Sequence, residues 1–341
     1  MSILTKKSFS AAVVTVTVFI GLWIIAGGWN FWRPVQVEKT DILMDTSVTV
    51  KIFIRNKKDG EQMIRDAFDA AKRIEHIMEP VKGNGELQRI NTRTAGGWFA
   101  LSSELSEVIH TARAYYERSG GAYDPTIAPV KWLWHFEDGG HIPSDSELVE
   151  SLRHVDMSRI EIEGDSLYFR GTETKLDLGA VAKGYAVDRM IDFLLSRGVE
   201  SILVNAGGDI AIRGMKPGEK DWVIGLRHPR LNRTIVLSSN PYPAVATSGD
   251  YERCFFENGI RYHHILDPGT GFPARGCASV TVWSETAMQA DILATTIFVL
   301  GPEKGLAFAE ALENVETCIF YERDGRLESV LSSGIRDWLS L

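Results

Sequence analysis

An uncharged stretch near the N-terminus most constrains how this chain can fold, because it divides the sequence into two unlike parts. No charged side chain occurs between Lys7 and Arg33, and Phe9–Gly28 reads FSAAVVTVTVFIGLWIIAGG. A transmembrane helix needs roughly 20 mostly apolar residues, whereas the apolar core of a cleaved signal peptide spans only ~7–15. We therefore expect an uncleaved membrane anchor at residues 1–32, with a cleaved signal peptide as the alternative. Since Lys6 and Lys7 precede the stretch, the rest of the chain is expected outside the cytoplasm.

The rest of the chain has the composition of a folded protein. Of the 341 residues, 44% are hydrophobic and 24% are charged, values that exclude a disordered or collagen-like chain. The formal net charge of −8 disfavours a nucleic-acid-binding protein, which needs a basic face. The three cysteines form no CxxC pair, so neither a zinc site nor a redox pair is indicated. We expect one domain over residues 35–341.

Hydrophobic periodicity places helices and strands along this domain. Apolar residues recur at helical spacing in some segments and alternate with polar residues in others. Helices are expected at 61–78, 102–118, 182–196, 286–300 and 303–312. Strands are expected at 47–54, 160–169, 174–178, 201–205, 210–213, 223–227, 234–237, 280–283 and 317–321. Since the two kinds of element mix without strict β–α–β alternation, we expect an α+β fold with a mixed sheet.

A strand-to-helix junction at Asp177–Gly184 is the first candidate site. The free N–H groups at a helix N-terminus bind phosphate, and Lys183 could pair with the same group. Asp177 could accept hydrogen bonds from a ribose or a heterocycle. The alternative is purely structural, with Asp177 capping the helix and Lys183 solvated at the surface.

A second candidate, Asn205–Asp209, contains two adjacent glycines. Glycine permits a positive φ and a close approach of the backbone to a ligand. A tight turn between two strands explains the same segment without any ligand.

Two adjacent histidines follow the polar segment Ala246–Asp250. Neighbouring side chains on a strand point to opposite faces, so one of His263 and His264 could face a site. A general base and a structural histidine are both consistent with this pattern.

The helix expected at 286–300 carries a carboxylate among apolar neighbours. Asp291 and Thr295 are four positions apart and therefore share one face of the helix. A buried carboxylate is costly unless it is paired or binds a metal. A carboxylate and a hydroxyl are hard oxygen ligands that suit Mg²⁺. An ordinary hydrogen-bonded pair is the alternative.

Taken together, these segments resemble the ApbE family of flavin transferases. Seven segments follow the family's order between about residues 42 and 301. They are Met44–Thr46, Gly121–Thr126 followed by Pro129 and Trp134, Leu176–Tyr185, Val204–Asp209, Thr247–Asp250, His264–Pro268 and Ala290–Thr295. The resemblance implies a bilobal ApbE-like domain behind the membrane anchor.

The resemblance also implies a reaction. Members bind FAD and Mg²⁺ and transfer FMN to a threonine or serine hydroxyl of a target protein, releasing AMP. The implied FAD contacts are Met44, Ala122, Tyr123, Asp124, Asp177, Lys183 and Ile265. The implied metal ligands are Asp291, Thr295 and the backbone carbonyls of Ala180 and Ala294. The target would carry a Ser/Thr-Gly-Ala-Thr-type stretch, and the catalytic domain would lie on the periplasmic side of a bacterial inner membrane.

Within this reaction, Asp250 and His264 are the candidates for the base that takes the proton of the acceptor hydroxyl. Two positions depart from the family pattern. Val81 stands where a tyrosine usually stacks on the flavin or adenine, and Gly85 stands where a serine is usual.

Two other functions fit the same residues. A Mg²⁺-dependent FAD pyrophosphatase would use water as the acceptor and release free FMN and AMP. An anchored module that binds FAD without turnover is the alternative from another class of protein.

Overall fold

The fold is built on one large antiparallel sheet. The computed structural model describes residues 34–231, 233–236 and 242–336, so the anchor predicted at residues 1–32 lies outside the described residues. The sheet consists, in chain order, of β1 (Val35–Leu43), β2 (Thr46–Ile54), β6 (Ser201–Ala206), β7 (Asp209–Arg213), β10 (Ala244–Gly249), β13 (Ser279–Ser284), β14 (Glu316–Arg323) and β15 (Arg326–Leu331). This is also their spatial order, and each neighbouring pair is antiparallel. The α+β class is confirmed, but the predicted mixed sheet is wrong, because every neighbouring pair is antiparallel. Tight turns join β1 to β2, β6 to β7 and β14 to β15, whereas longer connections return the chain antiparallel between the other neighbours.

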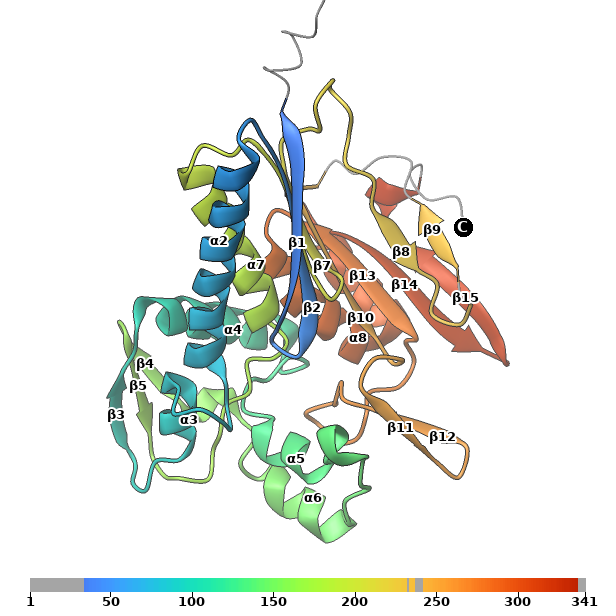
Figure 1. Ribbon diagram of the computed structural model, residues 1–341. Helices are drawn as coiled ribbons and strands as arrows, with labels where there is room; N and C mark the ends of the chain where they lie inside the picture. The colour runs from blue at the N-terminus through green and yellow to red at the C-terminus, as the bar shows by residue number, and fades with distance from the viewer. Residues whose placement is uncertain (1–33, 232, 237–241, 337–341) are drawn as a thin grey trace, which may run out of the picture.

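Three long helices cover one face of this sheet (Figure 1). They are α2 (Lys57–Met78), α7 (Ala182–Ser196) and α8 (Ala287–Glu310). α2 contacts β1 and β2, α7 contacts β6 and β7, and α8 contacts β10 and β13. α2 begins four residues before the predicted start because the Asn56 side chain accepts a hydrogen bond from Lys58 N and caps the helix. α8 joins the two predicted helices across a kink at Gly301, where φ is 79°.

The opposite face is covered by a smaller layer. β8 (Gly225–Arg227) pairs with β9 (Thr234–Val236), and this hairpin lies beside β14 and β15 (Figure 1). Leu226 and Ile235 of the hairpin pack against Trp283, Cys318 and Phe320 of the sheet. The sheet is therefore buried on both faces at its centre.

The remaining described elements form two smaller units at one end of the sheet. The first contains α3 (Glu86–Asn91), α4 (Ser103–Ser119) and a sheet of β3 (Gly97–Ala100), β5 (Ser166–Phe169) and β4 (Glu161–Glu163) in that order. The second contains α5 (Ala128–Leu133), α6 (Asp145–Leu152) and the hairpin of β11 (Cys254–Glu257) and β12 (Ile260–His263) around the buried Trp134. Short 3₁₀ helices within the described residues lie at Phe136–Asp138, Met157–Arg159 and Ser333–Ile335.

Two predicted strands are corrected by the structure. The segment 160–169 is a hairpin of β4 and β5, because a turn at Gly164 with φ of 53° reverses the chain. The segment 174–178 is no regular strand: Lys175 forms an isolated bridge to Ile127, and the Leu176 backbone bonds to the Asn91 side chain.

The apolar helix α8 belongs to the core. Among the described residues it is the one helix whose length and hydropathy would allow it to cross a membrane. Ile292, Leu293, Ile297 and Phe298 on this helix are fully buried against the sheet and its neighbours. Burial inside the domain accounts for its apolar character. The three cysteines carry free thiols.

Candidate active site

The predicted motifs meet at one end of the large sheet. Met44 and Asp45 form the turn between β1 and β2, and Gly207 and Gly208 form the turn between β6 and β7. Antiparallel pairing brings both turns to the same end of the sheet. Gly207 N donates to the Ser47 carbonyl at 3.1 Å, so the two turns lie against each other.

The first of these turns has an unusual backbone. Met44 and Asp45 have φ values of 51° and 56°, a conformation that non-glycine residues seldom adopt. Met44 N donates to Glu75 Oε1 at 2.7 Å, which ties the turn to α2. The structure therefore holds the predicted FAD contact Met44 in a fixed, strained position.

A lysine between two carboxylates forms the centre of the site. Lys183 Nζ lies 2.8 Å from Asp209 Oδ2 and 3.2 Å from Asp291 Oδ1. Asp209 and Asp291 are 2% and 3% exposed. Burial alone would lower the pKa of Lys183, but the two carboxylates raise it above its ordinary value. Burial and the charge of Asp291 raise the pKa of Asp209 to about 7.

The close crossing of α7 and α8 creates this cluster. Gly184 lies at the crossing, where a Cβ atom would stand 2.2 Å from the Ala287 carbonyl oxygen. Gly184 N donates to Asp291 Oδ2 at 3.0 Å. Asp188, one turn further along α7, caps α8 by accepting from Ala287 N at 2.9 Å and Met288 N at 2.8 Å. Each helix thus fixes the position of a charged side chain on the other.

The predicted metal ligands offer oxygen atoms of the kind that Mg²⁺ prefers. Asp291 supplies a carboxylate, and Thr295, one turn later, supplies a hydroxyl that lies 3.2 Å from Ser248 Oγ. Ala180 lies in the turn that leads into α7, outside the helical hydrogen-bond ladder. Ala294 lies in the middle of α8, where carbonyls accept helical bonds. The described residues contain no cluster of three His, Cys, Asp or Glu side chains suited to a metal, so water molecules or phosphate oxygens would supply the remaining ligands of Mg²⁺.

Asp177 is paired with a lysine that the sequence patterns did not single out. Lys131 Nζ on α5 lies 2.8 Å from Asp177 Oδ2, and Gly179 N donates to Asp177 Oδ1 at 2.9 Å. Burial alone would raise the pKa of Asp177, but the ion pair and this hydrogen bond lower it below its ordinary value. The carboxylate is therefore ionised at neutral pH. Lys131 stands between Pro129 and Trp134 of a motif, and this was the sole signal that could have identified it.

Two buried polar atoms near Asp177 have no partner among the described residues. They are the Tyr123 hydroxyl and His264 Nδ1. Burial, with the nearby charges of Asp177 and Asp291, raises the pKa of Tyr123 well above its usual value. Burial and the charge of Lys131 lower the pKa of His264 to about 3, so its imidazole is neutral at pH 7. Unpartnered buried polar atoms are uncommon in folded proteins, and a water molecule or a ligand can supply the missing partner.

The other histidine has a structural setting. His263 is 2% exposed, and its Nε2 lies 3.0 Å from the Ala274 carbonyl oxygen. Ile265, the predicted FAD contact that follows the pair, is 5% exposed, and its carbonyl accepts from Ala274 N at 2.9 Å. The two histidines thus differ in setting, because His263 Nε2 contacts a backbone carbonyl, although the Nδ1 atoms of both rings lack a hydrogen-bond partner among the described residues.

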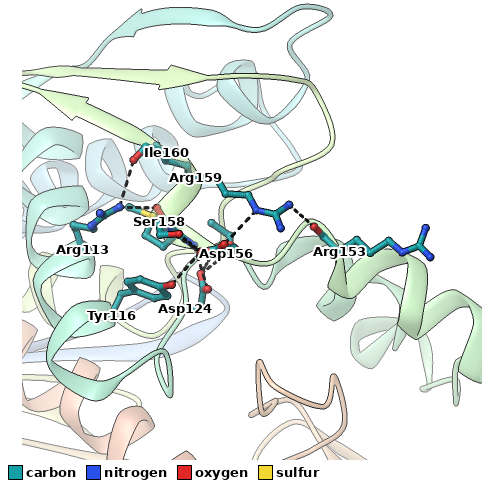
Figure 2. Close-up of polar contacts among 10 residues, drawn as sticks. Arg113, Tyr116, Asp124, Arg153, Asp156, Ser158, Arg159 and Ile160 are labelled. Carbon is teal, nitrogen blue, oxygen red and sulfur yellow. Dashed lines mark hydrogen bonds and ion pairs between the residues drawn. The ribbon is translucent and has the colours of Figure 1, made fainter.

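Asp124 is directed into the protein. Its Oδ1 accepts from Thr126 N at 2.8 Å and from Thr126 Oγ1 at 2.6 Å, and its Oδ2 accepts from Met157 N at 3.3 Å. Figure 2 shows Asp124 beside Asp156, which accepts from the Tyr116 hydroxyl at 3.0 Å. These contacts make Asp124 a support for its neighbour Tyr123. Ala122, the third residue of the predicted segment, follows two glycines in left-handed conformations and is half-buried.

Asp250 is held by two arginines. Arg230 donates from Nη1 at 2.8 Å to Oδ1 and from Nη2 at 2.6 Å to Oδ2. Arg261 Nη1 lies 2.9 Å from the same Oδ2. Both carboxylate oxygens of Asp250 are thus engaged with arginines, whereas His264 Nδ1 has no hydrogen-bond partner among the described residues.

The two departures from the family pattern lie in the connection between α2 and α3. Val81 is 49% exposed. Gly85 precedes α3 and packs so closely on α2 that a Cβ atom would stand 1.8 Å from the His76 carbonyl oxygen. A serine at position 85 would therefore require the two helices to separate.

Known proteins share this sequence and fold. A model of the ApbE family matches residues 44–320. A curated relative from Vibrio cholerae, named FAD:protein FMN transferase, is 33% identical over 313 residues, which cover 89% of this chain and 93% of the relative. The solved structure of the flavin transferase ApbE from Vibrio cholerae gives a TM-score of 0.82 at 30% identity, covering 90% of this chain and 100% of that one. The ApbE protein from Thermotoga maritima gives a TM-score of 0.79 at 33% identity, covering 89% of this chain and 99% of that one.

Proposed function

Because this chain belongs to the ApbE family, we propose that it is an FAD:protein FMN transferase, which moves FMN from FAD to a side chain of a target protein. The observation that carries this proposal is the arrangement around Lys183. A lysine and an oxygen-rich metal subsite at Asp291 and Thr295 share one end of the sheet with the unpartnered Tyr123 hydroxyl and His264 Nδ1. Cationic groups suit the diphosphate of FAD, and unpartnered polar atoms suit its heterocycles.

The reaction exchanges one phosphorus–oxygen bond for another. The hydroxyl oxygen of a threonine or serine on the target attacks the FMN-side phosphorus of FAD. The bond from that phosphorus to the bridging oxygen breaks, and AMP leaves with the bridging oxygen. The acceptor hydroxyl loses its proton to a base within hydrogen-bond reach, for which Asp250 and His264 are the candidates.

The other site residues bind and orient the substrate. The N-terminus of α7 and the Lys183 ammonium face the negative diphosphate. The ionised Asp177 accepts hydrogen bonds from a heterocycle or a ribose, while Met44, Tyr123, Ile265 and the backbone at Ala122 surround the flavin nucleotide. Mg²⁺ held by Asp291, Thr295 and the Ala180 carbonyl would supply Lewis-acid polarisation of a phosphoryl oxygen.

The location of the reaction follows from the N-terminal stretch. An anchor at residues 1–32 with Lys6 and Lys7 on the cytoplasmic side would place the catalytic domain on the periplasmic side of a bacterial inner membrane. The targets would then be membrane or exported proteins that carry a Ser/Thr-Gly-Ala-Thr-type stretch.

Intact-mass analysis tests the proposal. The full-length protein in detergent is incubated with FAD, Mg²⁺ and a purified acceptor domain that carries such a stretch. We expect the acceptor to gain the mass of one FMN, EDTA to abolish the gain, and Asp291→Ala to remove turnover without loss of the fold. Asp192→Ala, an exposed position on α7, serves as the active control.

The other results of this assay are informative. Free FMN and AMP without acceptor labelling would identify a pyrophosphatase. Intact FAD bound to the protein would identify a binding module, and normal Mg²⁺ dependence in Asp291→Ala would refute the metal subsite.

A further inference from the structure

Asp209 is the part of the lysine–carboxylate cluster that has no role in the reaction described above. Its Oδ2 lies 2.8 Å from Lys183 Nζ, closer than the 3.2 Å and 3.3 Å that separate this nitrogen from the two oxygens of Asp291. Asp209 is 2% exposed. An ionised side chain this deeply buried is stable only beside its partner.

The position of Asp209 is fixed by the turn before it. Asn205 Oδ1 accepts from Gly208 N at 2.9 Å across this turn. Gly207 has φ of 61°, and a Cβ atom there would stand 2.2 Å from Thr46 Oγ1. Asp209 is also the first residue of β7, at the centre of the large sheet. Its carboxylate is therefore a rigid anchor facing α7 and α8.

Lys183, by contrast, ends a flexible chain of four methylene groups. Its ammonium contacts both oxygens of Asp291, and these are the atoms that a divalent cation would need. An ammonium and a divalent cation on one carboxylate repel each other. A second carboxylate that holds the ammonium beside the metal subsite would relieve this conflict.

We propose that Asp209 is a positioning residue that holds the Lys183 ammonium to one side of Asp291, so that Asp291 can bind the divalent cation while Lys183 faces the diphosphate. The inference rests on the proposed function, because it takes Asp291 as the metal ligand. It assigns a purpose to the Asn205–Asp209 turn: the two glycines bring β6 and β7 round tightly enough to place one carboxylate at Lys183.

A double-mutant cycle of metal binding tests this role without any turnover. The affinity of the full-length protein in detergent for Mn²⁺ alone is measured by electron paramagnetic resonance for wild type, Asp209→Asn, Lys183→Met and the double variant. We expect Asp209→Asn to weaken Mn²⁺ binding about tenfold, because Lys183 then has Asp291 as its only anion. In the Lys183→Met background, Asp209→Asn should change the Mn²⁺ affinity less than about threefold. The difference between the two backgrounds measures the coupling of Asp209 to Lys183, and a coupling of this size is usual for contacting charged groups.

The controls separate this role from simpler ones. Asp192→Asn removes an exposed carboxylate of α7 that pairs with Arg189 and does not touch Lys183, and it should leave Mn²⁺ binding within about threefold of wild type. An equal loss of affinity for Asp209→Asn in both backgrounds, or an equal loss in Asp192→Asn, would show a general charge effect and overturn the inference. Wild-type Mn²⁺ binding in Asp291→Ala would instead refute the metal subsite of the proposed function, and with it this inference.

Discussion

The contact between α7 and α8 at Gly184 can be tested by Gly184→Ala, because the two explanations of this glycine predict changes of opposite sign in the free energy of unfolding. Glycine in a helix is less favourable than alanine by about 1 kcal/mol, so helix propensity alone predicts that Gly184→Ala stabilises the protein. The structure predicts the opposite. The added Cβ would stand 2.2 Å from the Ala287 carbonyl oxygen and 2.8 Å from Met288 Cα, and both are backbone atoms that cannot rotate away.

Inserting a methyl group into a packed region costs about 1–3 kcal/mol, and this contact belongs at the upper end of that range. After the propensity gain, we expect the free energy of unfolding to fall by about 2 kcal/mol. Urea denaturation followed by circular dichroism at pH 7 measures the change. Asp192→Ala on the exposed side of α7 is the control for propensity, with an expected change within about 0.5 kcal/mol.

The same substitution should weaken metal binding, because α8 carries Asp291 and must move away from α7. A Gly184→Ala protein as stable as wild type, with unchanged Mn²⁺ affinity, would show that the helices have room at this crossing. The account of how they fix the site would then be wrong.

Three further predictions concern the supports of the site. Glu75→Ala removes the acceptor for Met44 N, so it should lower the free energy of unfolding by about 2 kcal/mol and weaken FAD binding. Glu75→Gln keeps an acceptor and should retain most of the stability and most of the FAD affinity. Urea denaturation measures the stability, and fluorescence titration measures the FAD affinity. Asp124→Ala leaves the buried N–H groups of Thr126 and Met157 unpaired and should lower the free energy of unfolding by about 3 kcal/mol, as measured by urea denaturation. Asp124→Asn keeps one acceptor and should lower it less, and equal losses in the two variants would contradict the hydrogen-bond pattern. Burial lowers the pKa of His263 to about 4, below its unfolded value, so its contribution to stability is complete above about pH 6.5 and is lost as the pH falls toward 4. At pH 5 the loss should be about 2 kcal/mol relative to pH 7, and His263→Gln should reduce this pH dependence; an unchanged dependence would contradict the burial.

Elements with strong local patterns were predictable from the sequence. The helix at 182–196 has the bounds of α7, because its apolar positions repeat at helical spacing and glycine follows it at Gly198. The predicted 102–118 helix is confirmed as α4, whose N-cap Ser102 accepts from Leu105 N and whose C-cap Gly120 has φ of 63°. Local signals of this kind depend on residues within one or two turns.

Features that depend on distant partners were not predictable in this way. Strand direction in the large sheet is set by which strands become neighbours, and alternation within one strand carries no such information. The same holds for the 174–178 segment, whose backbone bonds to the Asn91 side chain. Hydrophobic alternation suggested a strand, but the Asn91 side chain forms the hydrogen bonds to Leu176 N and O that a neighbouring strand would otherwise form.

The candidate site shows the same division. Its motifs were visible in the sequence, but their contacts were not, because Lys183 and Asp291 are 108 positions apart. Lys131 was missed, and Asp209 was seen only as the end of a turn. The local sequence around a charged residue at the end of a glycine turn does not indicate which distant residue it will pair with in the fold.

The late position of α8 in the chain sets the order in which the site can form during synthesis. Lys183 and Asp209 are both made before Asp291 and Thr295, which lie on α8 (Ala287–Glu310). A nascent chain that ends before α8 therefore already contains Lys183 and Asp209, yet it lacks the carboxylate that we propose binds the metal. The central strand β13 likewise stays without its partner β14 until α8 is complete. The last sixth or so of the polypeptide, from α8 onward, thus completes both the sheet and the proposed metal subsite, and a chain truncated before α8 lacks Asp291 and Thr295.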